Sequence, residues 1–247
     1  MMNTLPLTTV ILLTLAVAHP AGAQVGIAPA TAAAGESMAT SEVQADPVMD
    51  KIAYLQTAWA DVKYGAASDN SKLATLDTLE KEAADLAAQY PARAEPKIWD
   101  AIILSTQAGV IKGISALPKV KHAKALLEGA LAIDPLALDG SAHTSLGSLY
   151  YQVPGWPIGF GDSKKAEQHL KAALAINPDG IDPNYFYGDF LLKQKRYDEA
   201  RAVLARAQMA PAREGRAVAD AGRQREIAEA MKLVQEGLAK GRKPEFN

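Results

Sequence analysis

The sequence predicts an all-α fold, a solenoid of helical hairpins closed at its C-terminal end by a covering helix. Three observations support this prediction. Prolines stand where helices begin and end, one spacing of small and large apolar residues recurs, and no stretch alternates well enough to indicate a strand. The chain has 247 residues, of which 49% are apolar, and this is enough to bury one sizeable core.

X-proline pairs mark the helix ends. Asp46-Pro47 and Asp182-Pro183 each place a capping carboxylate before a proline at the first helical position, where the missing N–H costs nothing. We therefore expect helices to begin at these two pairs. Tyr90-Pro91, Asp134-Pro135 and Asn177-Pro178 end helical runs, because a proline restricts the residue before it. Between these marks we expect about nine helices.

One apolar pattern recurs along the chain: an alanine, a leucine four residues later, a second alanine and a closing proline. It occurs at Ala123, Leu127, Ala130 and Pro135, at Ala166, Leu170, Ala173 and Pro178, and, with the proline one residue early, at Ala200, Leu204, Ala207 and Pro211. A helix with a Leu146-Gly147 or Tyr187-Gly188 pair precedes the second and third copies. We expect each glycine to let the following helix approach closely.

This pattern resembles the tetratricopeptide repeat, in which L-G-x-x-Y, A-x-x-x-F and a closing proline recur over 34 residues. The resemblance covers residues 46–211 and implies roughly four stacked helical hairpins. It predicts tetratricopeptide-like repeats at 47–216 with an inserted loop at 152–161. A C-terminal capping helix and tail follow at 217–247.

The inserted loop combines breaker residues with aromatic ones. Its prolines and glycines prevent a helix, and Trp156, Ile158 and Phe160 occupy every second position. An extended segment would turn these three side chains to one side. They either fold back over the hairpin and fill an apolar gap, or they form a wall of a ligand site.

The stretch from residue 149 to residue 192 resembles the envelope-exported repeat proteins grouped with the T component of TRAP transporters. Gly159-Phe160-Gly161-Asp162 and Asn184-Tyr185-Phe186-Tyr187 carry the resemblance. It implies a protein that pairs with a periplasmic solute-binding protein and holds a small apolar ligand in a pore between helices. The chain departs from the group's usual lipoprotein signal because it has no cysteine. Membrane tethering is therefore not carried over.

In such repeats the first helix of each hairpin lines the concave surface, so the face opposite Gly147 and Gly188 indicates a binding site. The predicted ligand- or partner-binding residues are Ser148, Tyr151, Trp156, Phe160, Asp182, Tyr185 and Asp189. Repeat proteins that grip a carboxylate present Lys, Arg and Asn on this face, whereas Tyr185 and Asp189 stand here. We therefore expect a basic, amide-rich or weakly polar aromatic ligand. Packing, capping or solvation is the alternative role of these side chains.

The N-terminal region predicts export. Residues 1–23 hold a short apolar run and then Ala21-Gly22-Ala23, which is typical of a secretory signal cleaved near Ala23/Gln24. Residues 24–46 are rich in small and polar residues and predict a disordered leader. A periplasmic or secreted protein without a membrane span is expected, because an apolar run of about ten residues is too short to cross a bilayer.

Motifs for catalysis are not found in the sequence. It contains no H-E-x-x-H, no G-x-x-x-x-G-K-[ST] and no G-x-S-x-G, so we expect no cofactor, no metal and no enzymatic activity. A formal charge of −2 and the lack of a basic stripe argue against nucleic-acid binding. Zero cysteines exclude disulfides and thiolate chemistry.

The last helix and the site lead to one functional hypothesis. Residues 217–240 predict an amphipathic helix that covers the solenoid end or binds a partner, with Ile227, Ala230, Met231, Val234 and Leu238 on one face. We expect an exported, non-enzymatic module that binds a protein partner in the envelope or a small apolar ligand, as an accessory to a periplasmic solute-binding protein. The alternative is a structural scaffold for envelope complex assembly that uses the outer surface and the tail helix.

Overall fold

The helices of this protein follow one another as antiparallel pairs. A computed structural model describes residues 46–241, which contain nine α-helices and a short 3₁₀ turn and no strand. The helices are α1 (Pro47–Tyr64), α2 (Asp69–Gln89), α3 (Ala94–Ile111), α4 (Leu117–Ile133), α5 (Ala137–Gln152), α6 (Ser163–Ile176), α7 (Ile181–Lys193), α8 (Tyr197–Gln208) and α9 (Ala217–Gly241), and the 3₁₀ turn is η1 (Ile114–Ala116). The predicted all-α class and hairpin architecture are confirmed.

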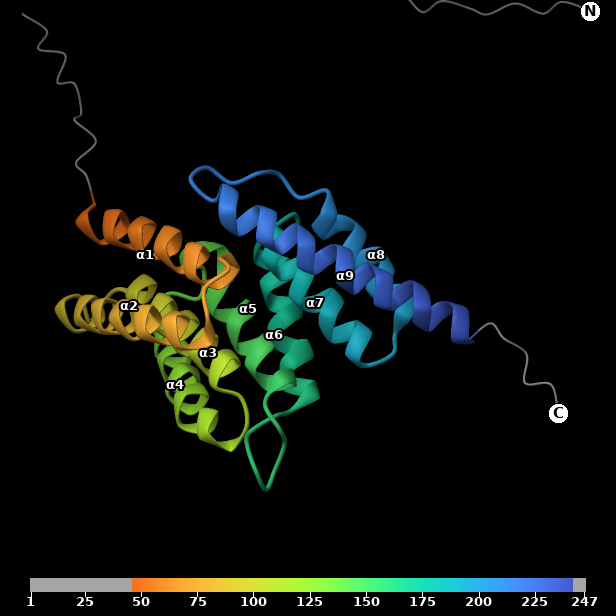
Figure 1. The fold of residues 1–247 in the computed structure, drawn as a ribbon, viewed down its shortest axis with the longest axis horizontal. Helices are drawn as coiled ribbons and strands as arrows, with labels where there is room; N and C mark the ends of the chain where they lie inside the picture. The colour runs from red at the N-terminus through yellow and green to blue at the C-terminus, as the bar shows by residue number, and fades with distance from the viewer. Residues whose placement is uncertain (1–45, 242–247) are drawn as a thin grey trace, which may run out of the picture. The chain divides into compact units, whose positions relative to one another are not determined.

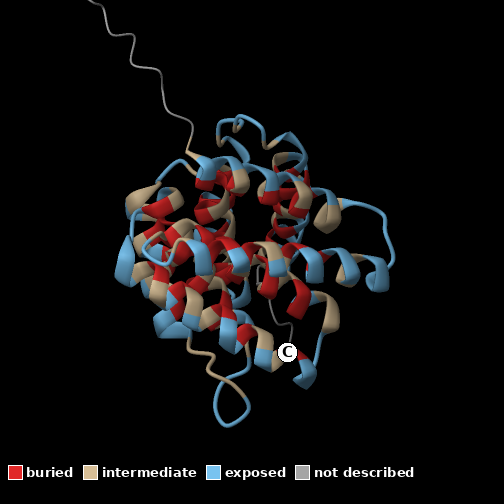
Figure 2. Ribbon diagram, turned by 90° about the vertical axis from the view of Figure 1, so that its left-hand side faces the viewer, coloured by how far each residue is buried: buried red, intermediate tan, exposed pale blue. Residues whose placement is uncertain are grey.

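Helix pairing produces a repeat whose first and last described helices meet. α3 packs on α4, α5 on α6 and α7 on α8, and α2 packs more extensively on α3 than on α1. α9 packs on α7 and α8, and it also contacts α1 (Figure 1). The repeat therefore closes on itself through α9. Figure 2 shows the buried helix segments gathered in the interior and the exposed ones at helix ends and loops.

The recurring apolar pattern forms the core of the hairpins. All nine of its alanines and leucines are fully buried: Ala123, Leu127, Ala130, Ala166, Leu170, Ala173, Ala200, Leu204 and Ala207. The close approach at the two glycines is confirmed as well. A Cβ at Gly147 would lie 2.6 Å from Leu170 Cγ, and one at Gly188 would lie 2.6 Å from Leu204 Cγ.

The predicted helix starts and stops are confirmed, except that Asp182 does not cap a helix. α2, α4 and α6 end directly before the predicted stop pairs, and Asp46 caps α1 by accepting a hydrogen bond from Val48 N at 2.9 Å. Asp182 does not cap α7, because that helix begins at Ile181 with Gly180 as its N-cap. Asp182 consequently lies in the first turn, where its carboxylate pairs with arginines instead.

The backbone departs from regular helix at both ends of α5. Leu138, Asp139 and Gly140 have φ values of 50°, 54° and 74°, so the regular part of α5 begins after this left-handed stretch. The loop between α5 and α6 spans residues 153–162, one residue later than predicted at each end. The predicted signal peptide, almost all of the predicted leader and the tail from residue 242 lie outside the described residues.

The apolar face predicted for α9 is confirmed. Ile227, Ala230 and Val234 are buried, and Met231 and Leu238 are partly buried. Near its N-terminal end α9 touches α1 so closely that a Cβ at Gly222 would lie 2.4 Å from the Tyr64 ring. α9 therefore covers the end of the repeat and also closes it against α1.

Candidate functional site

A cavity of about 1130 Å³ lies between the inner faces of the repeat. Its walls come from α1, α3, α5, α7 and the segment that leads into α9, with smaller contributions from α2 and α4. These helices surround one space because α9 joins the last hairpin to α1. The concave surface of the repeat is thereby converted into a partly enclosed chamber.

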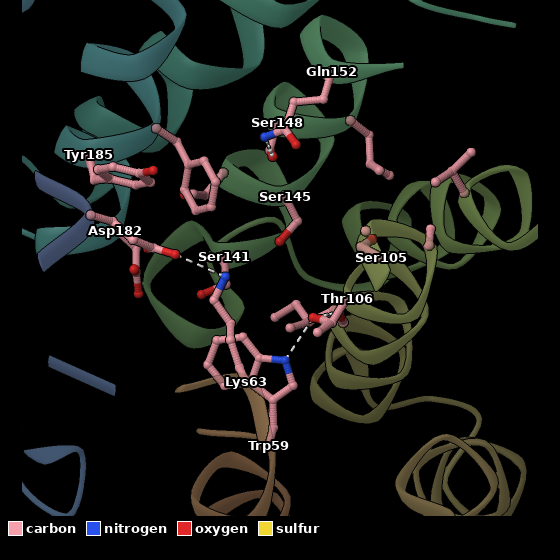
Figure 3. Close-up of a pocket in the computed structure, with 18 of the residues that line it drawn as sticks. Trp59, Lys63, Ser105, Thr106, Ser141, Ser145, Ser148, Gln152, Asp182 and Tyr185 are labelled. Carbon is pink, nitrogen blue, oxygen red and sulfur yellow. Dashed lines mark hydrogen bonds and ion pairs between the residues drawn. The ribbon is translucent and has the colours of Figure 1, made fainter. Parts of the chain in front are cut away.

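One wall of the cavity is a row of hydroxyl and amide groups. Figure 3 shows Ser141, Ser145, Ser148 and Gln152 along α5, with Asp182 and Tyr185 of α7 on one side and Ser105 and Thr106 of α3 on the other. Gln152 Nε2 donates a hydrogen bond to Ser148 Oγ at 2.8 Å. The row offers a ligand several groups that both donate and accept.

Two tryptophans form an aromatic wall that sequence reasoning missed. Trp59 of α1 and Trp99 of α3 line the cavity and meet edge to face with ring centres 5.7 Å apart. Trp59 Nε1 donates to Thr106 Oγ1 at 2.8 Å (Figure 3), whereas Trp99 Nε1 is buried and has no acceptor among residues 46–241. Forty residues separate the two tryptophans, so no local pattern connects them.

A network of ion pairs closes the end of the cavity between α7 and α9. Asp182 accepts from Arg213 Nη1 and Arg223 Nε, both at 2.7 Å. Arg223 also pairs with Glu226, which lies 3.1 Å from Lys63 Nζ of α1. Burial alone would raise the pKa of Asp182, but the two guanidinium groups outweigh it and hold this pKa below its usual range.

The other predicted acid is paired too. Tyr151 OH donates to Asp189 Oδ2 at 2.7 Å, and Lys193 Nζ lies 3.2 Å from the same oxygen. Burial, with the neighbouring Asp189, raises the pKa of Tyr151 well above its usual value. Asp189 lines the cavity, while Tyr151 lies behind it against Phe190.

The aromatic residues of the inserted loop do not reach the cavity. Trp156 is 90% exposed, and Phe160 packs edge to face on Tyr150 at 5.7 Å between ring centres. The expected one-sided arrangement is not seen, because Gly155 O accepts hydrogen bonds from Ile158 N and Gly159 N and so bends the loop into a turn. Ile158 and the base of the loop, rather than Trp156, line the cavity.

Four of the seven predicted site residues therefore line the cavity: Ser148, Asp182, Tyr185 and Asp189. The predicted roles themselves stay predictions. Sequence reasoning missed the basic residues that lead into α9 and lie within it. The burial of Arg223 could have been predicted from the sequence, because this arginine stands on the apolar face of its helix, four residues from both Ala219 and Ile227. Its exposed fraction is only 5%.

Two histidines form a titratable pair outside the cavity. His143 and His169 face each other with their Nδ1 atoms 2.9 Å apart, and burial lowers the pKa of both rings. No group of three or more acidic, histidine or cysteine side chains within residues 46–241 is arranged to hold a metal ion. In the same part of the chain no helix has the length and apolar character that a bilayer span requires.

Comparison with known proteins identifies the class of scaffold. Residues 158–221, from the inserted loop to the start of α9, match the family model described as tetratricopeptide repeat. No curated protein matches the chain. The matched segment therefore has the sequence of a tetratricopeptide repeat, a scaffold that generally mediates protein–protein interaction.

Proposed function

We propose that this chain is an exported, non-enzymatic binding protein that holds a small, largely apolar molecule in its central cavity. The observation that carries the proposal is the cavity of about 1130 Å³ enclosed where α9 meets α1. A solenoid that only displayed its concave face to an extended peptide would not need this closure.

The cavity has the chemistry of a small-molecule site. Ligand pockets are typically about 300–1,000 Å³, with apolar walls and a few placed polar groups. Here Trp59, Trp99 and aliphatic side chains of α3 to α5 supply the apolar surface, and the hydroxyl row of α5 supplies the polar groups. Asp182 and Asp189 are paired with basic side chains of the protein and are not positioned as a catalytic pair.

Export and the partner rest on the sequence alone. The signal-like residues 1–23 support a periplasmic or secreted location, and the resemblance of residues 149–192 to TRAP T components supports a role beside a periplasmic solute-binding protein. In that role the cavity protein would pass its ligand to the solute-binding protein or receive it from that protein.

The proposal is tested with the neutral fluorescent probe N-phenyl-1-naphthylamine. We expect its emission to rise on binding to the wild-type protein and to fall strongly with Ser145→Trp, since Ser145 lies in the middle of the hydroxyl row and a large ring there blocks this part of the cavity. Gln168→Trp, on the exposed face of α6, is the matched control and should bind like the wild type. Equal binding by the wild type and a folded Ser145→Trp variant would place the probe elsewhere and contradict the proposal.

A second candidate function is favoured by the 90% exposure of Trp156. Exposed tryptophans at loop tips often anchor protein partners. On this proposal a partner docks on the inserted loop, and Trp156→Ala abolishes its crosslinking in an envelope fraction without affecting probe binding. The scaffold alternative predicts a different result: no probe binds, and Ser145→Trp leaves partner capture intact.

A further inference from the structure

The cavity wall carries more basic than acidic side chains. The basic ones are Lys63, Lys72, Lys112, Lys193, Arg213, Arg216 and Arg223, and the acidic ones are Asp69, Asp139, Asp182, Asp189 and Glu226. Because the acids that sequence reasoning singled out are paired internally, they do not select a basic ligand. The basic side chains that line the cavity therefore outnumber the acidic ones, and the wall carries a positive net charge.

Part of this positive charge is neutralised at the α9 end of the cavity. Arg213 pairs with Asp182 and Asp220, at 2.7 and 2.6 Å, and Arg223 pairs with Asp182. Arg216 differs from these two arginines. Its side chain forms no ion pair or hydrogen bond with any residue in the described range 46–241, and its Nε is buried without a partner.

Arg216 stands in surroundings that make an unpaired cation costly. Its guanidinium carbon lies 5.5 Å from the ring centre of Trp99, which is 3% exposed and whose Nε1 also lacks an acceptor within residues 46–241. Burial, with the like charge of Arg213, lowers the pKa of Arg216. Arginine nevertheless stays protonated. The site therefore holds a partly desolvated positive charge that has no direct ion pair within residues 46–241, and Asp182 and Asp220 act on it only from a longer range.

The position of Arg216 also favours an anion. It directly precedes Ala217, the first residue of α9, and the N-terminal end of a long helix attracts negative charge. Away from Arg216, the wall on α3, α4 and α5 includes the apolar side chains Ile102, Leu117 and Leu149 beside the hydroxyl row. The cavity therefore combines a cationic corner with apolar surface and a row of neutral polar groups.

We propose that the cavity binds amphipathic monocarboxylates, with the carboxylate on Arg216 and the apolar body along α3 to α5. This inference rests on the proposed function and adds the class of ligand. A planar guanidinium group can donate two parallel hydrogen bonds to the two oxygens of a carboxylate, which forms a bidentate ion pair. One unpaired guanidinium balances one negative charge, whereas a dianion would bring a second charge into the same low-dielectric corner without a partner.

The experiment compares decanoate with decanol as competitors of N-phenyl-1-naphthylamine. In the wild-type protein we expect decanoate to displace the probe at a concentration at least about tenfold lower than decanol, which corresponds to about 1.4 kcal/mol. Arg216→Gln should remove this difference by weakening decanoate alone, and Arg216→Lys, which keeps the charge, should retain most of it. Lys72→Gln removes a different cation of the wall that has no ion pair within residues 46–241, and it should keep the preference for decanoate over decanol, whatever its effect on binding of the probe.

The outcomes separate this inference from the proposed function. If decanoate and decanol compete equally in the wild type, or if folded Arg216→Gln keeps the preference, the carboxylate assignment is wrong while the cavity remains a ligand site. Loss of the preference in Lys72→Gln instead would also overturn it, because the head group would then lie elsewhere. If neither the probe nor either competitor binds the wild-type protein, the proposed function fails and the inference fails with it.

Discussion

The hairpins of the repeat and the contact that closes them are held together by different interactions. Within the α5–α6 and α7–α8 hairpins, Gly147 and Gly188 let fully buried leucines pack against a helix backbone. At the closure, Arg223 and Asp182 join α9 to α7, and Glu226 joins α9 to Lys63 of α1. The hairpins therefore depend on apolar packing between neighbours in the chain, whereas the closure adds charge pairing between distant segments to the packing of α9 against Tyr64 of α1.

This difference has a consequence for pH. Asp182 at the closure is paired with arginines that lower its pKa, whereas Asp100 in α3 is buried with its Oδ1 unpartnered among residues 46–241. Burial, with the nearby Glu80, raises the pKa of Asp100 to about 7. Acid should thus weaken the closure, while alkali should weaken the helix packing around Asp100.

The largest effect is expected from Leu170→Ala. Leu170 is fully buried, so its truncation should lower the free energy of unfolding by about 3 kcal/mol. Gly147→Ala should cost about 2 kcal/mol, because the new Cβ would lie 2.6 Å from Leu170 Cγ. The double variant should cost less than the sum, since removal of Leu170 makes room for the methyl group. Urea unfolding followed by circular dichroism measures all three, and strict additivity would contradict the contact.

A smaller loss of about 2 kcal/mol is expected from Arg223→Met, because Asp182 and Glu226 then lose one cationic partner in a partly buried site. The folded-state pKa of Asp182 is lowered, so its contribution is present above the unfolded pKa of about 3.9 and is lost as the pH falls through the folded value. The stability of Arg223→Met should therefore fall less steeply below pH 4 than that of the wild type. Melting temperatures at pH 3 and pH 6 measure this, and equal acid sensitivity of both proteins would argue against the pair.

Asp100→Asn should have an effect of the opposite sign on pH dependence. Between its unfolded pKa of about 3.9 and its folded pKa of about 7, the folded chain holds a proton that the unfolded chain has released, so stability falls as the pH rises. The variant should gain roughly 2 to 3 kcal/mol relative to the wild type between pH 5 and pH 8. Denaturant titrations at the two pH values test this. A variant that loses stability equally at both would show that Asp100 titrates normally.

The smallest effect on stability is expected from Trp156→Ala. At 90% exposure this side chain contributes little packing, and the free energy of unfolding should change by less than about 0.5 kcal/mol. Tyr150→Ala, beneath the same loop, is the contrasting variant, because Tyr150 is buried against Phe160 and should cost several times more. Thermal unfolding compares them, and a large loss from Trp156→Ala would mean that the loop folds back as a plug.

The sequence predicted the hairpins well, because each depends on spacing within about 34 residues. The alanine and leucine positions, the stop prolines and the two glycines all have the predicted roles in packing. The prediction was less complete for the site. Asp182 was predicted to cap a helix, because it precedes a proline just as Asp46 does at the start of α1. Only its hydrogen bonds with Arg213 and Arg223 show that it forms ion pairs instead.

The sequence by itself thus determined the hairpin repeat and the core faces of α4, α6, α8 and α9, since periodicity and proline sterics act locally. The tertiary structure alone decided that α9 returns to α1, that Trp59 and Trp99 share a wall, and that the acids of the concave face are neutralised. The physical reason is that charge pairing and cavity closure depend on which distant side chains meet. That pairing leaves Arg216 as a partly buried cation of the cavity wall without an ion pair within residues 46–241.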